Sequence, residues 1–157
     1  MKVVIIYYSR GGTTKKMAEV ISEEIKNKGL DVDTFLVDEV KPAQLLEYDG
    51  IIIGSPTYYG TLAAQIKGLL DESVAFHGKL DGKVGAAFSS AANIGGGNET
   101  TVLSILEAML IHGMVIQGDP RGDHYGPVAI AKVDARCQDN CKRLAERFVG
   151  LLKKLKQ

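Results

Sequence analysis

Residues 2–28 read KVVIIYYSRGGTTKKMAEVISEEIKNK, and this stretch decides the fold class. The run VVIIYY is apolar and mostly β-branched or aromatic, too short for a helix and suited to a strand buried on both faces. After the turn, Met17, Val20, Ile21 and Ile25 recur at helical spacing with charged residues between them. This spacing predicts an amphipathic helix.

The turn between this strand and helix contains Ser9, Gly11, Gly12, Thr13 and Thr14. A chain that enters a helix so abruptly leaves several backbone N–H groups without partners, at the positive end of the helix dipole. Three hydroxyls and two glycines at the same place suit a bound phosphate.

An ordinary helix cap is the alternative interpretation of this turn, because Ser and Thr are common N-caps and Gly-Gly makes tight turns. The common nucleotide-binding patterns do not match. No glycine stands where G-x-x-x-x-G-K-[ST] requires one before Lys15, and the adjacent glycines break G-x-G-x-x-G. A phosphate here would be held by hydroxyls and backbone, with Arg10 as the cation inside the turn.

The composition is that of a globular protein, with 157 residues, 45% apolar and 24% charged. This length predicts a single domain over residues 1–157. Nineteen basic residues balance nineteen acidic ones, which gives no support for nucleic-acid binding. The apolar run at residues 3–8 is far too short for a signal peptide or a membrane span, so we expect a cytoplasmic protein without a membrane partner.

The two cysteines, Cys137 and Cys141, lie in CQDNC without histidines at metal-binding spacing. We therefore expect reduced, half-buried thiols and no metal site.

Strand and helix patterns alternate along the rest of the chain. Further strands are predicted at residues 31–37, 51–53, 83–89 and 114–116, a helical turn at 43–46, and helices at 65–70, 98–112 and 134–155, with a loop at 118–127. This alternation predicts an α/β fold, a doubly wound five-stranded parallel sheet of order 2-1-3-4-5 with helices on both faces.

Three segments with unusual composition follow strands of this sheet: residues 9–14, 55–60 (SPTYYG) and 90–97 (SAANIGGG). Ligands of doubly wound sheets bind at the carboxyl ends of the strands. A phosphate turn, an aromatic wall and a glycine wall on one edge indicate a flat, phosphorylated aromatic ligand, a description that FMN fits. For the glycine-rich segment, a flexible surface loop is the alternative.

The motifs KVVIIYYSRGGTTKKMA, GSPTYYGTLAAQIKGLLD and GKVGAAFSSAANIGGGNETTVLSILEAMLIHGMVI resemble the flavodoxin superfamily, most closely its WrbA-type NAD(P)H:quinone oxidoreductase and flavodoxin-like branch. The resemblance covers residues 2–116 and implies a flavodoxin-like fold that binds FMN.

The resemblance also assigns candidate cofactor-binding residues. They are Ser9, Arg10, Gly11, Gly12, Thr13 and Thr14 for the phosphate; Pro56, Thr57, Tyr58, Tyr59 and Gly60 beside the ring; Ser89, Ser90, Ala91, Ala92, Asn93, Ile94, Gly95, Gly96 and Gly97 at its pyrimidine end; and His112 at its edge. Tyr125 and His124 resemble the family's late loop that ends in Tyr-Gly, and they either cover the ring or fold back. For His112, a helix C-cap is the alternative.

The family implies that FMN performs redox chemistry while the protein binds it, so no catalytic side chain is expected. The first hypothesis is reduction by NAD(P)H followed by two-electron reduction of a quinone or similar acceptor. The alternatives are a non-enzymatic electron carrier with protein partners and a flavin-binding regulatory module.

Two departures from the family bear on these hypotheses. The chain lacks the insertions that help larger WrbA-type reductases form tetramers, which leaves a homodimer or a homotetramer open. It is also neutral, whereas flavodoxin carriers are strongly acidic.

Overall fold

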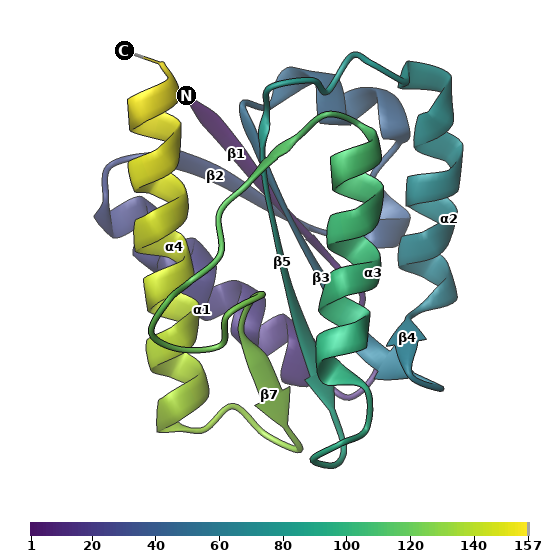
Figure 1. Ribbon diagram of the computed structural model, residues 1–157, viewed down its shortest axis with the longest axis vertical. Coiled ribbons are helices and arrows are strands. Elements are labelled where there is room, and N and C mark those ends of the chain that lie inside the picture. Colours follow the sequence, from purple (N-terminus) through teal and green to yellow (C-terminus); the bar gives the residue numbers. More distant parts are fainter. Residues whose placement is uncertain (157) are drawn as a thin grey trace.

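The computed structural model describes residues 1–156 and contains one sheet of order β2-β1-β3-β5-β6 (Figure 1). β1 (Lys2–Tyr7) pairs in parallel with β2 (Asp31–Leu36) and β3 (Gly50–Tyr58), and β5 (Val84–Ala91) pairs with β3. The predicted order 2-1-3-4-5 is confirmed, with one difference at the edge. Two short strands, β6 (Val115–Ile116) and β7 (Val128–Ile130), both pair with β5 and share the fifth position.

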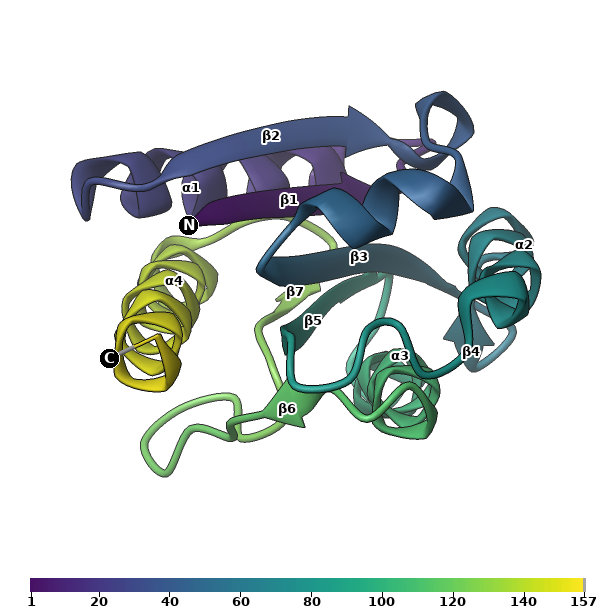
Figure 2. The same ribbon diagram turned by 90° about the horizontal axis from the view of Figure 1, so that it is seen from above.

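Helices cover both faces of the sheet, as predicted. α1 (Thr13–Asn27) and α4 (Ala135–Leu155) pack on one face, and α2 (Ala64–Glu72) and α3 (Asn98–Ile111) on the other (Figure 2). Val3 and Ile5 of β1 face the first pair of helices, whereas Val4 and Ile6 face the second. Because both faces are covered, β1 is apolar from Val3 to Tyr7 instead of alternating. Each helix of residues 1–156 is too short or too polar to cross a membrane.

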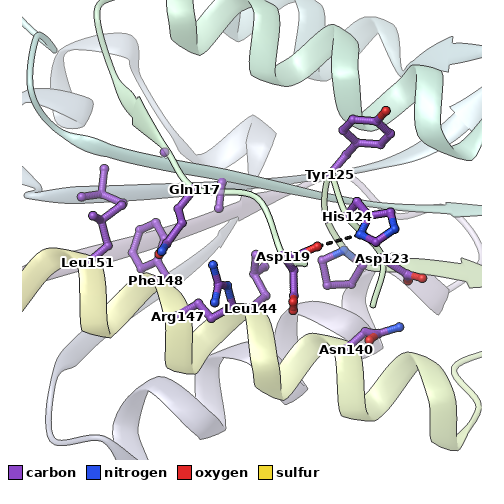
Figure 3. A pocket seen from close by; sticks show the side chains of 15 residues that line it. Gln117, Asp119, Asp123, His124, Tyr125, Asn140, Leu144, Arg147, Phe148 and Leu151 are labelled. Atoms are coloured by element: carbon purple, nitrogen blue, oxygen red, sulfur yellow. Dashed lines mark hydrogen bonds between the residues drawn. The ribbon is translucent and has the colours of Figure 1, made fainter. Parts of the chain in front are cut away.

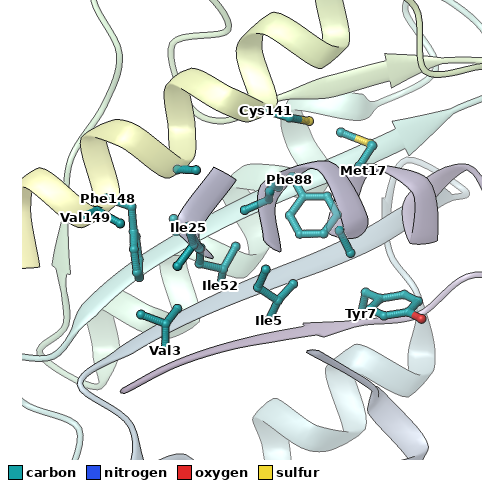
Figure 4. Packing of buried hydrophobic residues seen from close by; sticks show 14 of the residues in the cluster. Val3, Ile5, Tyr7, Met17, Ile25, Ile52, Phe88, Cys141, Phe148 and Val149 are labelled. Atoms are coloured by element: carbon teal, nitrogen blue, oxygen red, sulfur yellow. The ribbon is translucent and has the colours of Figure 1, made fainter. Parts of the chain in front are cut away.

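The core under α1 and α4 is built around Phe88 of β5, which is completely buried with Met17 and Ile52 (Figure 4). Phe88 lies opposite Gly54 in the β3–β5 pair. A Cβ at Gly54 would collide with the Phe88 ring, so glycine at this position lets the ring lie over β3.

The prediction of a loop at residues 55–60 is wrong for most of that segment. β3 continues to Tyr58, then turns back through Tyr59 and Gly60 into the antiparallel strand β4 (Thr61–Leu62). The strand continues because Ser55 and Pro56 still pair with β5, and Tyr58 then pairs with β4. The helical turn predicted at residues 43–46 is the 3₁₀ helix Pro42–Glu47. β7 was not predicted, because three residues are too few for a recognisable strand pattern.

Candidate functional site

A cavity of about 640 Å³ lies at the carboxyl edge of the sheet, within the usual size of small-molecule sites. Segments from β1, β3 and β5 meet there, as expected for a doubly wound sheet. The cavity is lined by Ser9, Arg10, Gly11, Thr13, Thr14, Pro56, Thr57, Tyr58, Ser90, Ala91, Ala92 and Ala131. The structure therefore brings together eleven of the predicted residues and adds Ala131, which the sequence did not indicate.

The turn before α1 presents an open set of backbone donors. Gly12 is the N-cap residue, with φ of 90° and no side chain to cap the helix. Ser9 Oγ accepts the N–H groups of Gly12 (3.1 Å) and Lys15 (3.3 Å). The N–H groups of Arg10, Gly11, Thr13 and Thr14 have no acceptor anywhere in residues 1–156. These amides can bind an anion at the helix start.

The charges around this turn also favour an anion. The first turn of α1 contains no acidic residue. It contains Lys15 and Lys16, and Arg10 reaches the cavity. Positive side chains and the positive end of the helix dipole thus act together.

Two hydroxyls join this turn to neighbouring segments. Thr14 Oγ1 and Ser90 Oγ are 3.0 Å apart and buried, so α1 is hydrogen-bonded to the end of β5. Thr13 Oγ1 donates to the Ala131 carbonyl over 3.3 Å. The walls of the cavity are therefore fixed to one another by side-chain contacts.

The paired tyrosines take different positions. Tyr58 lines the cavity, is 38% exposed, and packs edge-on against Tyr8 with ring centroids 6.2 Å apart. Tyr59 is fully exposed and has φ of 49° at the tip of the turn. Of the two rings expected beside the ligand, Tyr58 lines the cavity, whereas Tyr59 does not.

The glycine-rich segment contributes only its beginning to the cavity, through Ser90, Ala91 and Ala92. Ser89 is completely buried, and its hydroxyl donates to the Asn98 carbonyl over 2.9 Å. The later residues line a second groove of about 570 Å³. This groove includes Ile94, Gly95 and Gly97 together with parts of β7 and α4. Gly12, Gly60, Asn93 and Gly96 line neither space.

Ala131 completes the cavity in a strained conformation, with φ of 60°. Its N–H donates to the Ala91 carbonyl over 2.7 Å, and the Lys132 N–H donates to the Ile130 carbonyl over 2.6 Å. The second bond closes a γ-turn around Ala131, and a γ-turn with positive φ at its central residue is rare and strained. Alanine gives no sequence signal for such a turn, so Ala131 could not have been predicted.

His112 lies away from the cavity. It follows α3, which begins at the carboxyl edge and spans 14 residues, or about 20 Å at 1.5 Å per residue. His112 is buried, with Nε2 2.8 Å from Ser73 Oγ. Burial, with a smaller effect from the nearby His77, lowers the pKa of the His112 imidazole. The structure does not bring this residue together with the others.

Tyr125 and His124 lie on the segment between β6 and β7, over a narrow crevice beside α4 (Figure 3). Arg143 of α4 forms an ion pair with Asp119 of the same segment, and the His124 ring nitrogen Nδ1 lies 2.7 Å from the Asp119 carbonyl oxygen. Neither Tyr125 nor His124 lines the carboxyl-edge cavity. The resemblance suggested that Tyr125 and His124 cover a ring, but the segment that contains them is joined to α4 by the Arg143–Asp119 ion pair.

Comparison with known proteins identifies the family. The model of the flavodoxin family matches residues 5–91. A flavodoxin of Clostridium saccharobutylicum is 36% identical over 99% of both chains. The chain belongs to the flavodoxin family. An NAD(P)H dehydrogenase (quinone) of Azorhizobium caulinodans is 37% identical over 84% of this chain and 77% of its own length. A solved flavodoxin structure from the domain Archaea is 32% identical, covers both chains completely and has a TM-score of 0.80.

Membership of the flavodoxin family implies an FMN-binding flavoprotein. The cavity fits that cofactor at both of its ends. The unpartnered amides at the start of α1 suit a phosphate, and the part of the cavity lined by Tyr58, Ala91 and Ala92 suits a flat ring. The sequence resemblance to flavodoxins and quinone oxidoreductases is confirmed by these relatives.

Proposed function

We propose that this flavodoxin-family protein is an FMN-dependent reductase that oxidises NAD(P)H and reduces a quinone or a similar two-electron acceptor. FMN, when bound, supplies the hydride-accepting and electron-donating chemistry. The protein contributes binding, orientation and the electrostatic environment.

The phosphate of the cofactor would be held by backbone. The amides of Arg10, Gly11, Thr13 and Thr14 are available to donate to it, and Arg10 adds a positive charge. The hydroxyl of Thr13 can turn from the Ala131 carbonyl toward a phosphate oxygen, because its present bond is long at 3.3 Å.

The observation that carries the reductase proposal is the asymmetry of the ring slot. The lining contributed by β3 includes the aromatic side chain of Tyr58, whereas the lining contributed by β5 and the residue after it includes the small residues Ala91 and Ala92. The glycine-rich segment that follows contains no aromatic residue. One face of a bound ring would therefore be free of an aromatic cover, and a nicotinamide or a quinone could stack there.

Among the described residues, the cavity lining contains no carboxylate, imidazole or thiol for proton transfer. Of its twelve lining residues in the described chain, none is a carboxylate, a histidine or a cysteine, and Arg10 is the charged one. A hydride transfer between stacked rings requires no acid or base from the protein, so this lining is compatible with the proposal.

A non-enzymatic electron carrier is the second candidate. The full-length match to a flavodoxin favours it, because the quinone dehydrogenase extends beyond the aligned region. The balanced charge of nineteen basic and nineteen acidic residues weighs against it, since the flavodoxins that carry electrons are strongly acidic. The cytoplasmic location of the protein and its assembly as a homodimer or homotetramer remain predictions.

Stopped-flow mixing of the FMN-loaded protein with NADH and with NADPH separates the candidates. The reductase proposal predicts bleaching of the flavin absorbance near 450 nm within about a second, followed by recovery on addition of a benzoquinone, as typical turnover numbers of about 10 s⁻¹ require. Retention of the yellow colour for minutes with both nucleotides would contradict the reductase and favour the carrier.

A further inference from the structure

The turn that carries Tyr58 is attached to the N-terminal part of α3 by three hydroxyl contacts. Thr101 Oγ1 lies 2.9 Å from Thr57 Oγ1, and Thr61 Oγ1 lies 3.1 Å from Ser104 Oγ. Between them, Thr100 Oγ1 lies 2.6 Å from the Gly60 carbonyl oxygen. We call these three contacts the hydroxyl bridge.

The proton of the Thr100 hydroxyl is directed to Gly60. Two carbonyl oxygens approach this hydroxyl, those of Gly60 at 2.6 Å and Gly97 at 2.8 Å. The Gly97 carbonyl already accepts the Thr101 N–H over 3.0 Å, and the Thr101 hydroxyl oxygen also lies 2.9 Å from it. The Gly60 carbonyl has no other donor within residues 1–156. Since a hydroxyl has one proton, Thr100 donates it to Gly60.

The same contact lies where the turn after Tyr58 and the end of the glycine-rich segment approach each other closely. Gly97 packs so closely against this turn that a Cβ there would lie 2.7 Å from Gly60 Cα. Thr100 thus joins the turn after Tyr58 to the end of the glycine-rich segment, directly beside this backbone contact.

The turn needs such support because it is strained. Tyr59 and Gly60 both have positive φ, 49° and 83°, as in type I′ hairpins, which prefer Asn-Gly. A tyrosine persists in this conformation only where its surroundings determine it.

We infer that Thr100 is a positioning residue for the flavin ring: its hydroxyl holds the Tyr58 turn against the glycine-rich segment and sets the width of the slot before the cofactor binds. This inference rests on the proposed function, because it requires FMN in the cavity. A preformed slot avoids the ordering of a loop on binding, so its loss weakens affinity.

The test compares Thr100→Val, which removes the hydroxyl at nearly constant shape, with Thr100→Ser, which retains it. Thr34→Val is the matched control, because the Thr34 hydroxyl donates to Ser22 on another face over 3.2 Å. FMN affinity is measured by fluorescence titration of each apoprotein, and the flavin midpoint potential is measured by dye-coupled reduction.

For Thr100→Val we expect an FMN dissociation constant about fivefold higher, because the net loss of one hydrogen bond has about this effect. The flavin midpoint potential should shift toward that of free FMN. Thr100→Ser and Thr34→Val should match the wild type in both quantities. Unchanged affinity and potential in Thr100→Val would overturn the role of Thr100 while leaving the proposed function intact. If the wild type itself does not bind FMN, both fail.

Thr100 is exposed, so Thr100→Val is expected to fold. Should it not fold, Ser104→Ala removes another contact of the hydroxyl bridge. A rise in the dissociation constant supports the inference, and an unchanged value overturns it.

Discussion

The hydrogen bond between Thr14 and Ser90 connects the phosphate turn to the end of β5, and its removal should destabilise the protein measurably. The two oxygens are 3.0 Å apart, and the residues are 1% and 6% exposed. Neither hydroxyl has another partner within residues 1–156. Thr14→Val therefore leaves the Ser90 hydroxyl buried without a partner, which costs about 1–3 kcal/mol.

In a chain of this size, a loss of about 2 kcal/mol lowers the Tm by roughly 4–8 °C. Thr14→Val, Ser90→Ala and the double variant are compared by urea unfolding of the apoprotein, followed by far-UV circular dichroism. The second substitution should cost less once the first is present, with a coupling energy of about 1 kcal/mol. Strict additivity of the two single variants would show that the two hydroxyls contribute to stability independently, which contradicts this hydrogen bond.

Four further predictions concern single residues. Gly12→Glu should abolish FMN retention while leaving the far-UV spectrum unchanged, because it puts a carboxylate into the phosphate turn at a position with open space around the Cβ. Undiminished flavin content would contradict the assignment. Tyr58→Ala should raise the FMN dissociation constant about tenfold because a stacking contact with the ring is lost, whereas Tyr59→Ala should leave it unchanged. Equal effects of the two substitutions in an FMN titration would contradict the placement of the ring beside Tyr58. Ala131→Gly should stabilise the apoprotein by up to about 1 kcal/mol in urea unfolding, since it relieves a left-handed alanine, and a clear loss of stability would argue otherwise. Burial lowers the pKa of His112, so the unfolded chain binds a proton at this imidazole more readily than the folded chain does. The free energy of unfolding should therefore be complete above the ordinary pKa of about 6.5 and fall as the pH drops below it. An equal fall between pH 7 and 5 in His112→Gln would exclude His112 as the cause.

The sheet and its order could be predicted from the sequence because local patterns determine them. The apolar run at residues 3–8 requires two covered faces, and the glycines after it mark an abrupt entry into a helix. Alternation of strands and helices then restricts the topology to few choices. The phosphate turn and the beginning of the glycine-rich segment meet in one cavity for this reason.

Features that depend on three-dimensional packing could not be predicted. Which of two adjacent tyrosines enters the slot depends on the hairpin after Tyr58, and the sequence suggested a loop there. His112 was placed beside the ring by its motif, although a helix of 14 residues carries it to the opposite edge of the sheet. Ala131 is held by hydrogen bonds to Thr13 and Ala91, and nothing in an alanine indicates them.

The central claim is that the carboxyl-edge cavity holds FMN between the turn before α1 and Tyr58. Titration of the apoprotein with FMN, followed by quenching of flavin fluorescence, tests it most directly. Binding of FMN in this cavity should give saturable quenching at one FMN per chain, and this quenching should be lost in Gly12→Glu. Flavin fluorescence that stays at the value of free FMN up to a large excess of protein would contradict it.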